Sequence, residues 1–174
     1  ADELATMNQP PFPIDETALF VAYYASAEFG CFLTLGWDMP TRILDLYVER
    51  RRLTNGRGIP EKGRSLVATM KAYGLPAIGT DEKEEMRNLA MRAGEHYNRA
   101  EQDALLEYCQ SDVDALVDLL PVMLPDILKG PTNPERVLGQ ALLRGRYMAA
   151  AARIEYAGVR RATAMVARVR DPGA

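Results

Sequence analysis

The sequence has little of what several common protein classes require. Only two cysteines, Cys31 and Cys109, occur in 174 residues, and they are too few and too far apart to indicate a disulfide scaffold or a zinc knuckle. They fit a reducing, cytoplasmic setting, which we expect for this chain. The single histidine, His96, has no sequence partner that would make it a zinc ligand or the base of a catalytic triad.

Long apolar runs are also missing, and the first residues, Ala1 to Leu4, do not resemble a signal peptide. The formal net charge is -3, so any contact with nucleic acid must come from a local basic patch rather than from a global field. The length and the apolar fraction are those of one ordinary domain with a real core. Because the sequence begins with Ala1 instead of Met, we expect a fragment of a longer chain.

A strand, a helix and a second strand are predicted in succession near the start. Residues 18–24 form a short apolar run rich in strand formers, residues 27–35 read as a helix stopped by Gly36, and residues 43–48 read as another strand. This order is typical of a βαβ unit, whose right-handed crossover makes the two strands parallel. Active sites in such sheets lie at the carboxyl ends of the strands.

Glu28 falls just past the end of the first predicted strand. A carboxylate at this place is well positioned to bind a metal ion. The alternative is a solvated residue in the first turn of a helix, where a negative charge favours the helix dipole. The sequence by itself leaves both interpretations open.

The chain is organised around a helix predicted over residues 98–120, capped by Asn98 with Glu101 and ended by Pro121. At about 100° per residue one apolar stripe is expected to face the core; its members are Leu105, Cys109, Val113, Leu116 and Leu120. Tyr108 and Asp112 lie one turn apart at the edge of that stripe. A carboxylate there needs a hydrogen-bond donor, a cation or a metal as partner, and a plainly hydrogen-bonded boundary residue is the simpler alternative.

Residues 49–64 are basic and interrupted by glycine, which predicts a loop. Its arginines are candidates for contacts with nucleic-acid phosphates, although solvated surface arginines are common; they are Arg50, Arg51, Arg52 and Arg57. Three further helices are predicted over residues 65–73, 82–92 and 134–157, all with structural roles.

Four stretches resemble, in the right order, the 3′–5′ exonuclease region of family A, polymerase I-like DNA polymerases. They are residues 19–37, residues 42–49, the segment from Tyr108 to Asp112, and residues 142–155. The resemblance implies that Tyr108 orients the attacking water, that Asp112 and Glu28 bind a divalent metal, Mg²⁺ or Mn²⁺, and that the substrate is a DNA 3′ end. Asp45 matches a strand position beside the site, which we interpret as structural.

Two departures from the family pattern bear on activity. The family's first motif, an Asp-x-Glu that supplies two of its four carboxylates, is not found before Phe20, so we expect activity to be impaired in this chain. The family's second motif has an Asp where this chain has Glu28, and an Asn where it has Tyr24.

The expected fold class is therefore α/β: a ribonuclease H-like exonuclease fold with an incomplete sheet and a predominantly helical C-terminal half. We divide the chain into a linker (1–17), a partial exonuclease domain (18–130) and a helical connection toward a polymerase region (131–174). The alternative function is a non-catalytic nucleic-acid-binding or scaffolding domain with the same fold.

Overall fold

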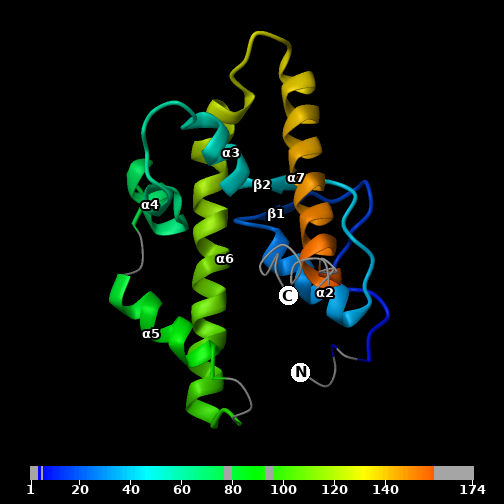
Figure 1. Ribbon diagram of the computed structural model, residues 1–174, viewed down its shortest axis with the longest axis vertical. Coiled ribbons are helices and arrows are strands. Elements are labelled where there is room, and N and C mark those ends of the chain that lie inside the picture. Colours follow the sequence, from blue (N-terminus) through cyan, green and yellow to red (C-terminus); the bar gives the residue numbers. More distant parts are fainter. Residues whose placement is uncertain (1–3, 5, 77–79, 93–95, 159–174) are drawn as a thin grey trace, which may run out of the picture.

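The computed structural model describes residues 4, 6–76, 80–92 and 96–158, except for the side chains of residues 80–84. The fold is mixed α/β and mostly helical, with one small parallel sheet at its centre (Figure 1). In chain order the elements are β1 (Phe20–Ala22), α2 (Ser26–Leu35), β2 (Ile43–Asp45), α3 (Leu46–Leu53), the 3-10 helix η1 (Glu61–Arg64), α4 (Leu66–Ala72), α5 (Thr80–Ala90), α6 (Arg99–Leu128) and α7 (Pro134–Ala157).

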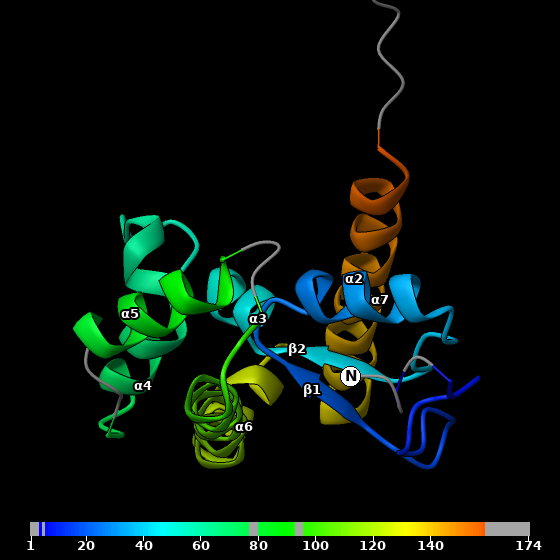
Figure 2. The same cartoon turned by 90° about the horizontal axis from the view of Figure 1, so that it is seen from below.

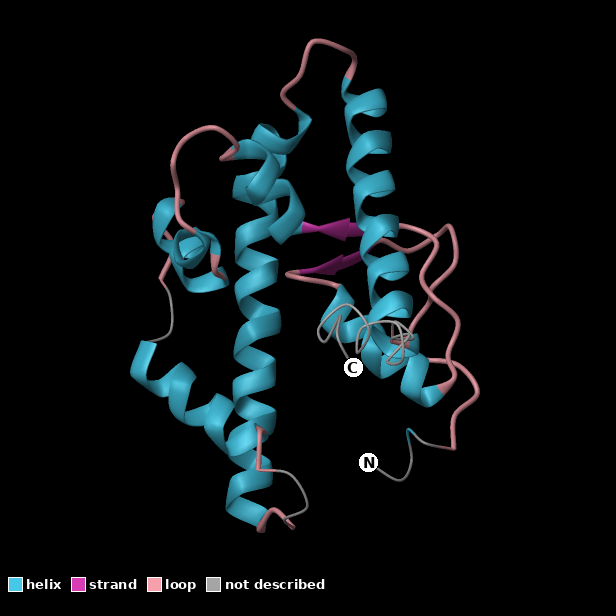
Figure 3. Cartoon of the chain, in the orientation of Figure 1, coloured by secondary structure: helices cyan, strands magenta, loops and turns pink. Residues whose placement is uncertain are grey.

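The predicted βαβ unit is confirmed. Strands β1 and β2 are parallel, with Phe20 opposite Ile43 and Ala22 opposite Asp45, and α2 connects them. Gly36 ends α2 in the left-handed conformation, with φ of 71°, as expected of a glycine at a helix C-terminus. Figure 3 shows how small the sheet is beside the helices that surround it.

The second strand is shorter than the sequence predicts, and residues 46–48 belong to α3 instead. The reason is Asp45, whose side chain accepts a hydrogen bond of 2.9 Å from the backbone N–H of Val48 and so caps α3. A strand pattern of apolar residues does not reveal that its central aspartate acts as a helix cap. The prediction of a loop directly after Val48 was therefore wrong, because α3 extends to Leu53.

The same carboxylate also holds the start of α2. Asp45 accepts hydrogen bonds from the backbone N–H of Ala25 at 2.7 Å and from that of Tyr24 at 3.4 Å. Helix α2 has no side-chain cap of its own, because Ser26 lies inside the helix. Asp45 is 1% exposed, so these contacts are shielded from water. One buried acid thus fixes the beginnings of two helices.

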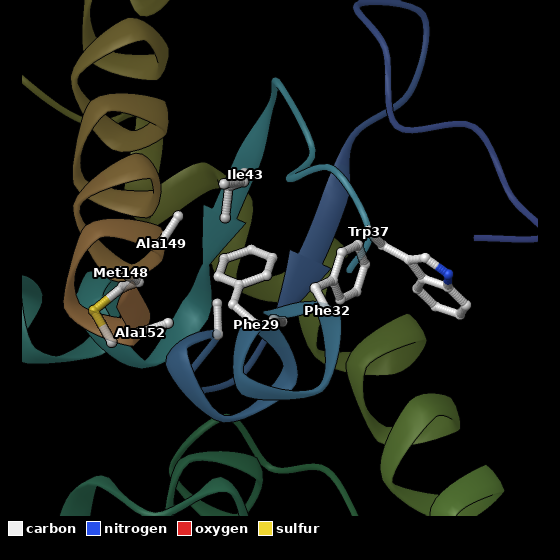
Figure 4. Packing of buried hydrophobic residues seen from close by; sticks show 9 residues of the cluster. Phe29, Phe32, Trp37, Ile43, Met148, Ala149 and Ala152 are labelled. Atoms are coloured by element: carbon white, nitrogen blue, oxygen red, sulfur yellow. The ribbon is translucent and has the colours of Figure 1, made fainter. Parts of the chain in front are cut away.

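The strands separate two apolar clusters, and successive strand residues point to opposite ones. Ile43 belongs to the cluster beneath α2 and α7, whereas Leu44 belongs to the cluster beneath α6. Figure 2 shows α2 and α6 on different sides of the strands. Figure 4 shows Phe29 and Phe32 of α2 packed between α7, with Ala149 and Ala152, and Trp37.

Helix α7 begins with the predicted Asn133 cap and crosses directly over β2. At the crossing a Cβ atom added to Gly145 would lie 2.0 Å from the backbone oxygen of Ile43. Only glycine permits this approach, since no real side-chain carbon comes so near a backbone oxygen. Gly145 therefore sets the distance between α7 and the sheet.

Helix α6 begins with the predicted capping box of Asn98 and Glu101 but does not end at Pro121. It continues through Pro121 and Pro125 to Leu128, which corrects the predicted C-terminus. The last turns bury Leu119, Met123 and Ile127 completely, and this burial outweighs the loss of two backbone hydrogen bonds.

The predicted apolar stripe of α6 was partly wrong as well. Cys109 and Val113 are exposed, whereas Tyr108 and Asp112 are half-buried on the side of the helix that carries Leu119. The inward face of the helix includes Ala115 and Leu119 beside the predicted Leu116 and Leu120, so it is turned from the predicted stripe toward Tyr108 and Asp112. Asp112 is consequently closer to the protein interior than the pattern indicated.

The segment before β1, predicted as a linker, lies against the core. The indole Nε1 of Trp37 donates a 2.7 Å hydrogen bond to the carbonyl of Met7, and the ring of Phe12 lies 6.2 Å from that of Phe32. None of the helices among the described residues has both the length and the apolar character needed to cross a bilayer.

Replacing Gly145 with alanine is expected to lower the free energy of unfolding by about 3 kcal/mol or more, because the added methyl group collides with the β2 backbone. Gly139→Ala is the matched control on the same helix, since nothing lies within 4 Å of its Cβ position. That substitution should raise stability by about 0.5 to 1 kcal/mol through helix propensity. Urea denaturation followed by circular dichroism measures both, and equal effects would contradict the close crossing.

Asp45→Ala is expected to cost about 2 to 4 kcal/mol, because it leaves the N-terminal N–H groups of two helices without their acceptor. Asp45→Asn keeps one acceptor oxygen and should lose less. Asp118→Ala, at an exposed position of α6, serves as control. If thermal unfolding shows no difference between the Asp45→Ala and Asp118→Ala proteins, Asp45 does not hold the two helices.

Candidate functional site

Glu28 lies in the first turn of α2, just beyond the carboxyl end of β1. Its side chain is half-buried, and its Oε2 atom is buried without a hydrogen-bond partner among the described residues. The pKa of Glu28 is raised to about 7, mainly by burial and in smaller part by the neighbouring charges of Asp45 and Asp112, while a hydrogen bond from its own backbone N–H opposes the rise. A buried, unsatisfied carboxylate with a raised pKa is typical of functional sites.

Asp112 reaches this place from α6. Its charge acts on Glu28, so the two carboxylates lie close enough to interact although 84 positions separate them in the sequence. Tyr108 stands one helical turn before Asp112 and is half-buried on the same face. The structure therefore places Asp112 within electrostatic reach of Glu28 and puts Tyr108 on the same face of α6 as Asp112.

Asp45 is near the same acids but has another task. Burial raises its pKa, and the hydrogen bonds from the backbone N–H groups of Val48, Ala25 and Tyr24 oppose that rise. Both of its oxygens already accept these bonds. It is therefore a structural residue beside the site, as its sequence position indicated.

Glu28 and Asp112 fit part of a metal site rather than a complete one. The orphaned Oε2 of Glu28 is a hard oxygen ligand of the kind that Mg²⁺ and Mn²⁺ prefer. Within the part of the chain that the structure describes, no group of three or more His, Cys, Asp or Glu side chains is arranged to hold an ion. Two carboxylates provide one edge of such a site.

Tyr108 also forms part of the wall of a large cavity of about 950 Å³ between α4, α5 and α6. Lys62, Lys71 and Arg87 line this cavity, and no acidic side chain does among those that the structure describes, which exclude the side chains of residues 80–84 in α5. A surface of this charge attracts a polyanion. Sequence reasoning missed these three residues because they are far apart in the chain and form no basic run.

The four arginines predicted to bind nucleic acid do not form one patch. Arg50 and Arg57 line a cavity of about 380 Å³ with Lys129, whereas Arg51 and Arg52 line a different cavity. Arg50, Arg51 and Arg52 lie on α3, not in the predicted loop, and successive residues of a helix point in different directions.

Arg52 has a structural role in addition. Its Nε donates a 2.8 Å hydrogen bond to Glu49, and its Nη2 donates a 3.0 Å bond to the carbonyl of Ile127 near the end of α6. Its side chain thus joins α3 to the last turn of α6. The Arg52 guanidinium group is therefore already engaged within the protein, whereas the sequence predicted it only as a contact for nucleic acid.

Comparisons of the chain with protein-family models, with curated protein sequences and with solved structures find no match.

The raised pKa of Glu28 predicts a pH-dependent stability. Because the protonated acid is favoured in the folded state, its contribution is complete below pH 4.5 and is lost as the pH rises through about 7. The wild-type protein should lose up to about 3 kcal/mol relative to Glu28→Gln between pH 4.5 and pH 8. Urea denaturation of both proteins across this range measures the difference, and parallel pH profiles would show that Glu28 titrates normally.

Proposed function

We propose that this chain is part of a 3′–5′ exonuclease domain with a ribonuclease H-like fold, of the kind attached to polymerase I-like DNA polymerases. Its reaction is metal-dependent hydrolysis of the phosphodiester bond at a DNA 3′ end. The observation that supports the proposal is that the charge of Asp112, on α6, acts on Glu28, which follows the carboxyl end of a parallel strand pair.

The described residues have distinct parts in this function. Glu28 and Asp112 would hold a divalent ion, and that Mg²⁺ or Mn²⁺ would supply an activated water and would stabilise the leaving oxygen. Tyr108 positions the attacking water through its hydroxyl. The basic cavity beside Tyr108 holds the phosphates of the substrate strand with Lys62, Lys71 and Arg87.

The raised pKa of Glu28 makes metal binding dependent on pH. At neutral pH a proton occupies about half of the Glu28 carboxyl groups, because its pKa is about 7. The proton must leave before the carboxylate ligates a cation, so affinity should rise between pH 6 and pH 8. The family's remaining two carboxylates belong to its Asp-x-Glu motif, and full activity requires them in addition.

A second function, DNA binding without hydrolysis, is favoured by one observation. The described residues include a basic cavity but no set of three metal-ligating side chains. A domain of this kind would retain the strand through the cavity beside Tyr108 and would need no cation. Metal binding separates the two functions.

Isothermal titration with Mn²⁺ at pH 8 tests the proposal. We expect the wild-type chain to bind Mn²⁺ and Glu28→Gln or Asp112→Asn to weaken binding by about tenfold or more, since each removes a ligand. Asp118→Asn, on the exposed side of α6, is the control and should bind as the wild type does.

Absence of binding by the wild-type chain would favour the non-catalytic function. In a chain extended upstream to include an Asp-x-Glu, Asp112→Ala should also abolish Mn²⁺-dependent release of 3′ nucleotides from labelled single-stranded DNA. Equal rates for that variant and the Asp118→Ala control would remove Asp112 from the mechanism.

A further inference from the structure

A second cavity lies on the other flank of α2. It has a volume of about 500 Å³ and is bounded by the loop before α2, the first turn of that helix, α3 and α7. Ser26 lines it, and Glu28 does not. Residues two positions apart in a helix point about 200° from each other. The side chains of Ser26 and Glu28 therefore lie on different sides of α2. The volume is in the range of pockets that hold a small molecule.

Ser26 is the first sign that this cavity takes a ligand. The residue is 2% exposed, and its Oγ atom has no hydrogen-bond partner among the described residues. A buried hydroxyl without a partner is unfavourable, and native proteins rarely retain one. A ligand with an acceptor atom in the cavity would supply the missing bond.

The arginines of the cavity indicate that the ligand is an anion. Glu49 is fully buried and accepts from Arg144 Nε at 2.6 Å, from Arg144 Nη2 at 3.0 Å and from Arg52 Nε at 2.8 Å. One carboxylate thus serves two guanidinium groups and leaves one positive charge uncompensated. Arg51 adds a second charge. Glu155, at the exposed rim, is the acidic residue in the described lining, and Glu61, outside the lining, interacts with Arg51.

Arg51 is the arginine best placed to bind a ligand. Its guanidinium group lies 5.7 Å from the ring centre of Tyr47 and interacts with the charge of Glu61, which accepts a hydrogen bond from the Tyr47 hydroxyl. An arginine fixed against an aromatic ring presents its planar fork of N–H groups in a defined direction. That fork matches the oxygens of a phosphate group.

Three tyrosines complete the wall, namely Tyr24, Tyr47 and Tyr147. Tyr147 is 70% exposed and Tyr24 is 43% exposed, so their rings are accessible from solvent. Tyr24 also has φ of 76°, the only non-glycine residue with positive φ among those described, and such strained residues concentrate at ligand sites. Accessible aromatic rings beside a cationic group are the usual platform for a nucleic-acid base.

From these observations we propose that the cavity between α2, α3 and α7 binds a nucleotide, with its phosphate on Arg51 and the Ser26 hydroxyl and its base against Tyr147. The site is separate from the acids of the proposed nuclease site and does not depend on a metal ion. A free nucleoside monophosphate and the 5′-phosphorylated end of a DNA strand share this chemistry. Arginine and hydroxyl donors recognise the phosphate in both.

Isothermal titration of the full chain in EDTA tests the proposal with deoxyadenosine 5′-monophosphate, deoxyadenosine and inorganic phosphate as probes. We expect the nucleotide to bind more tightly than either of its parts. Arg51→Gln should weaken nucleotide binding by about tenfold or more, and Ser26→Ala by about fivefold, the usual effects of one charged and one neutral hydrogen bond. Tyr147→Ala should weaken binding of the nucleotide and leave that of inorganic phosphate unchanged.

Arg153→Gln is the matched control, because Arg153 is an exposed arginine of α7 outside this cavity. Nucleotide affinity that is the same in the Arg51→Gln and Arg153→Gln proteins would overturn the proposal, as would tighter binding of deoxyadenosine than of the nucleotide. Circular dichroism of each variant establishes that the fold is retained.

A 5′-phosphorylated oligodeoxynucleotide distinguishes the two sources of the phosphate. Displacement of the mononucleotide by this strand, but not by its unphosphorylated form, identifies a strand end as the ligand; retention of the mononucleotide identifies the free nucleotide. Asp112→Asn should bind the nucleotide as the wild type does. Nucleotide binding can therefore be confirmed even if the nuclease proposal is wrong, and the nuclease proposal can be confirmed even if no nucleotide binds here.

Discussion

The carboxylate of Asp45 is the interaction on which the rest of the structure depends. It ends β2, caps α3 and accepts from the backbone at the start of α2, so three elements meet at one buried acid. Burial of a charge is unfavourable, and hydrogen bonds from four backbone N–H groups, those of Tyr24, Ala25, Tyr47 and Val48, offset that cost. Both candidate sites lie beside this junction. The position of Asp45 therefore determines how the starts of α2 and α3 are placed at both sites.

Helix α2 divides the two sites. Glu28 on one flank faces the acid of α6, and Ser26 on the other faces the arginines of α3 and α7. The two flanks differ in charge because Asp45 and Asp112 stand on the first, while Arg51 and Arg144 stand on the second. A single short helix therefore has an acidic flank, where we propose a cation site, and a basic flank, where we propose an anion site.

The sequence predicted the βαβ unit and the caps at Asn98 and Asn133, because these depend on local patterns and short-range hydrogen bonds. The prediction that Glu28, Tyr108 and Asp112 form one site came from a resemblance and not from periodicity, and the structure shows an electrostatic interaction between Glu28 and Asp112. The start of α3 was missed because the cap is a residue inside the strand pattern. The continuation of α6 past Pro121 was missed because tertiary burial of Met123 and Ile127 outweighs local helix propensity. The cavity at Ser26 was missed because it is formed by segments over 100 residues apart in the sequence.

The close crossing of α7 over β2 has a consequence for synthesis of the chain. Ile43 of β2 is synthesised about 100 residues before Gly145. Gly145 has no side chain, and this allows α7 to pack closely on β2. Until then the aromatic residues beneath α2 lack the wall that Met148, Ala149 and Ala152 provide. The nascent N-terminal half consequently exposes an apolar face to water and to chaperones until residues 145–152 have been synthesised.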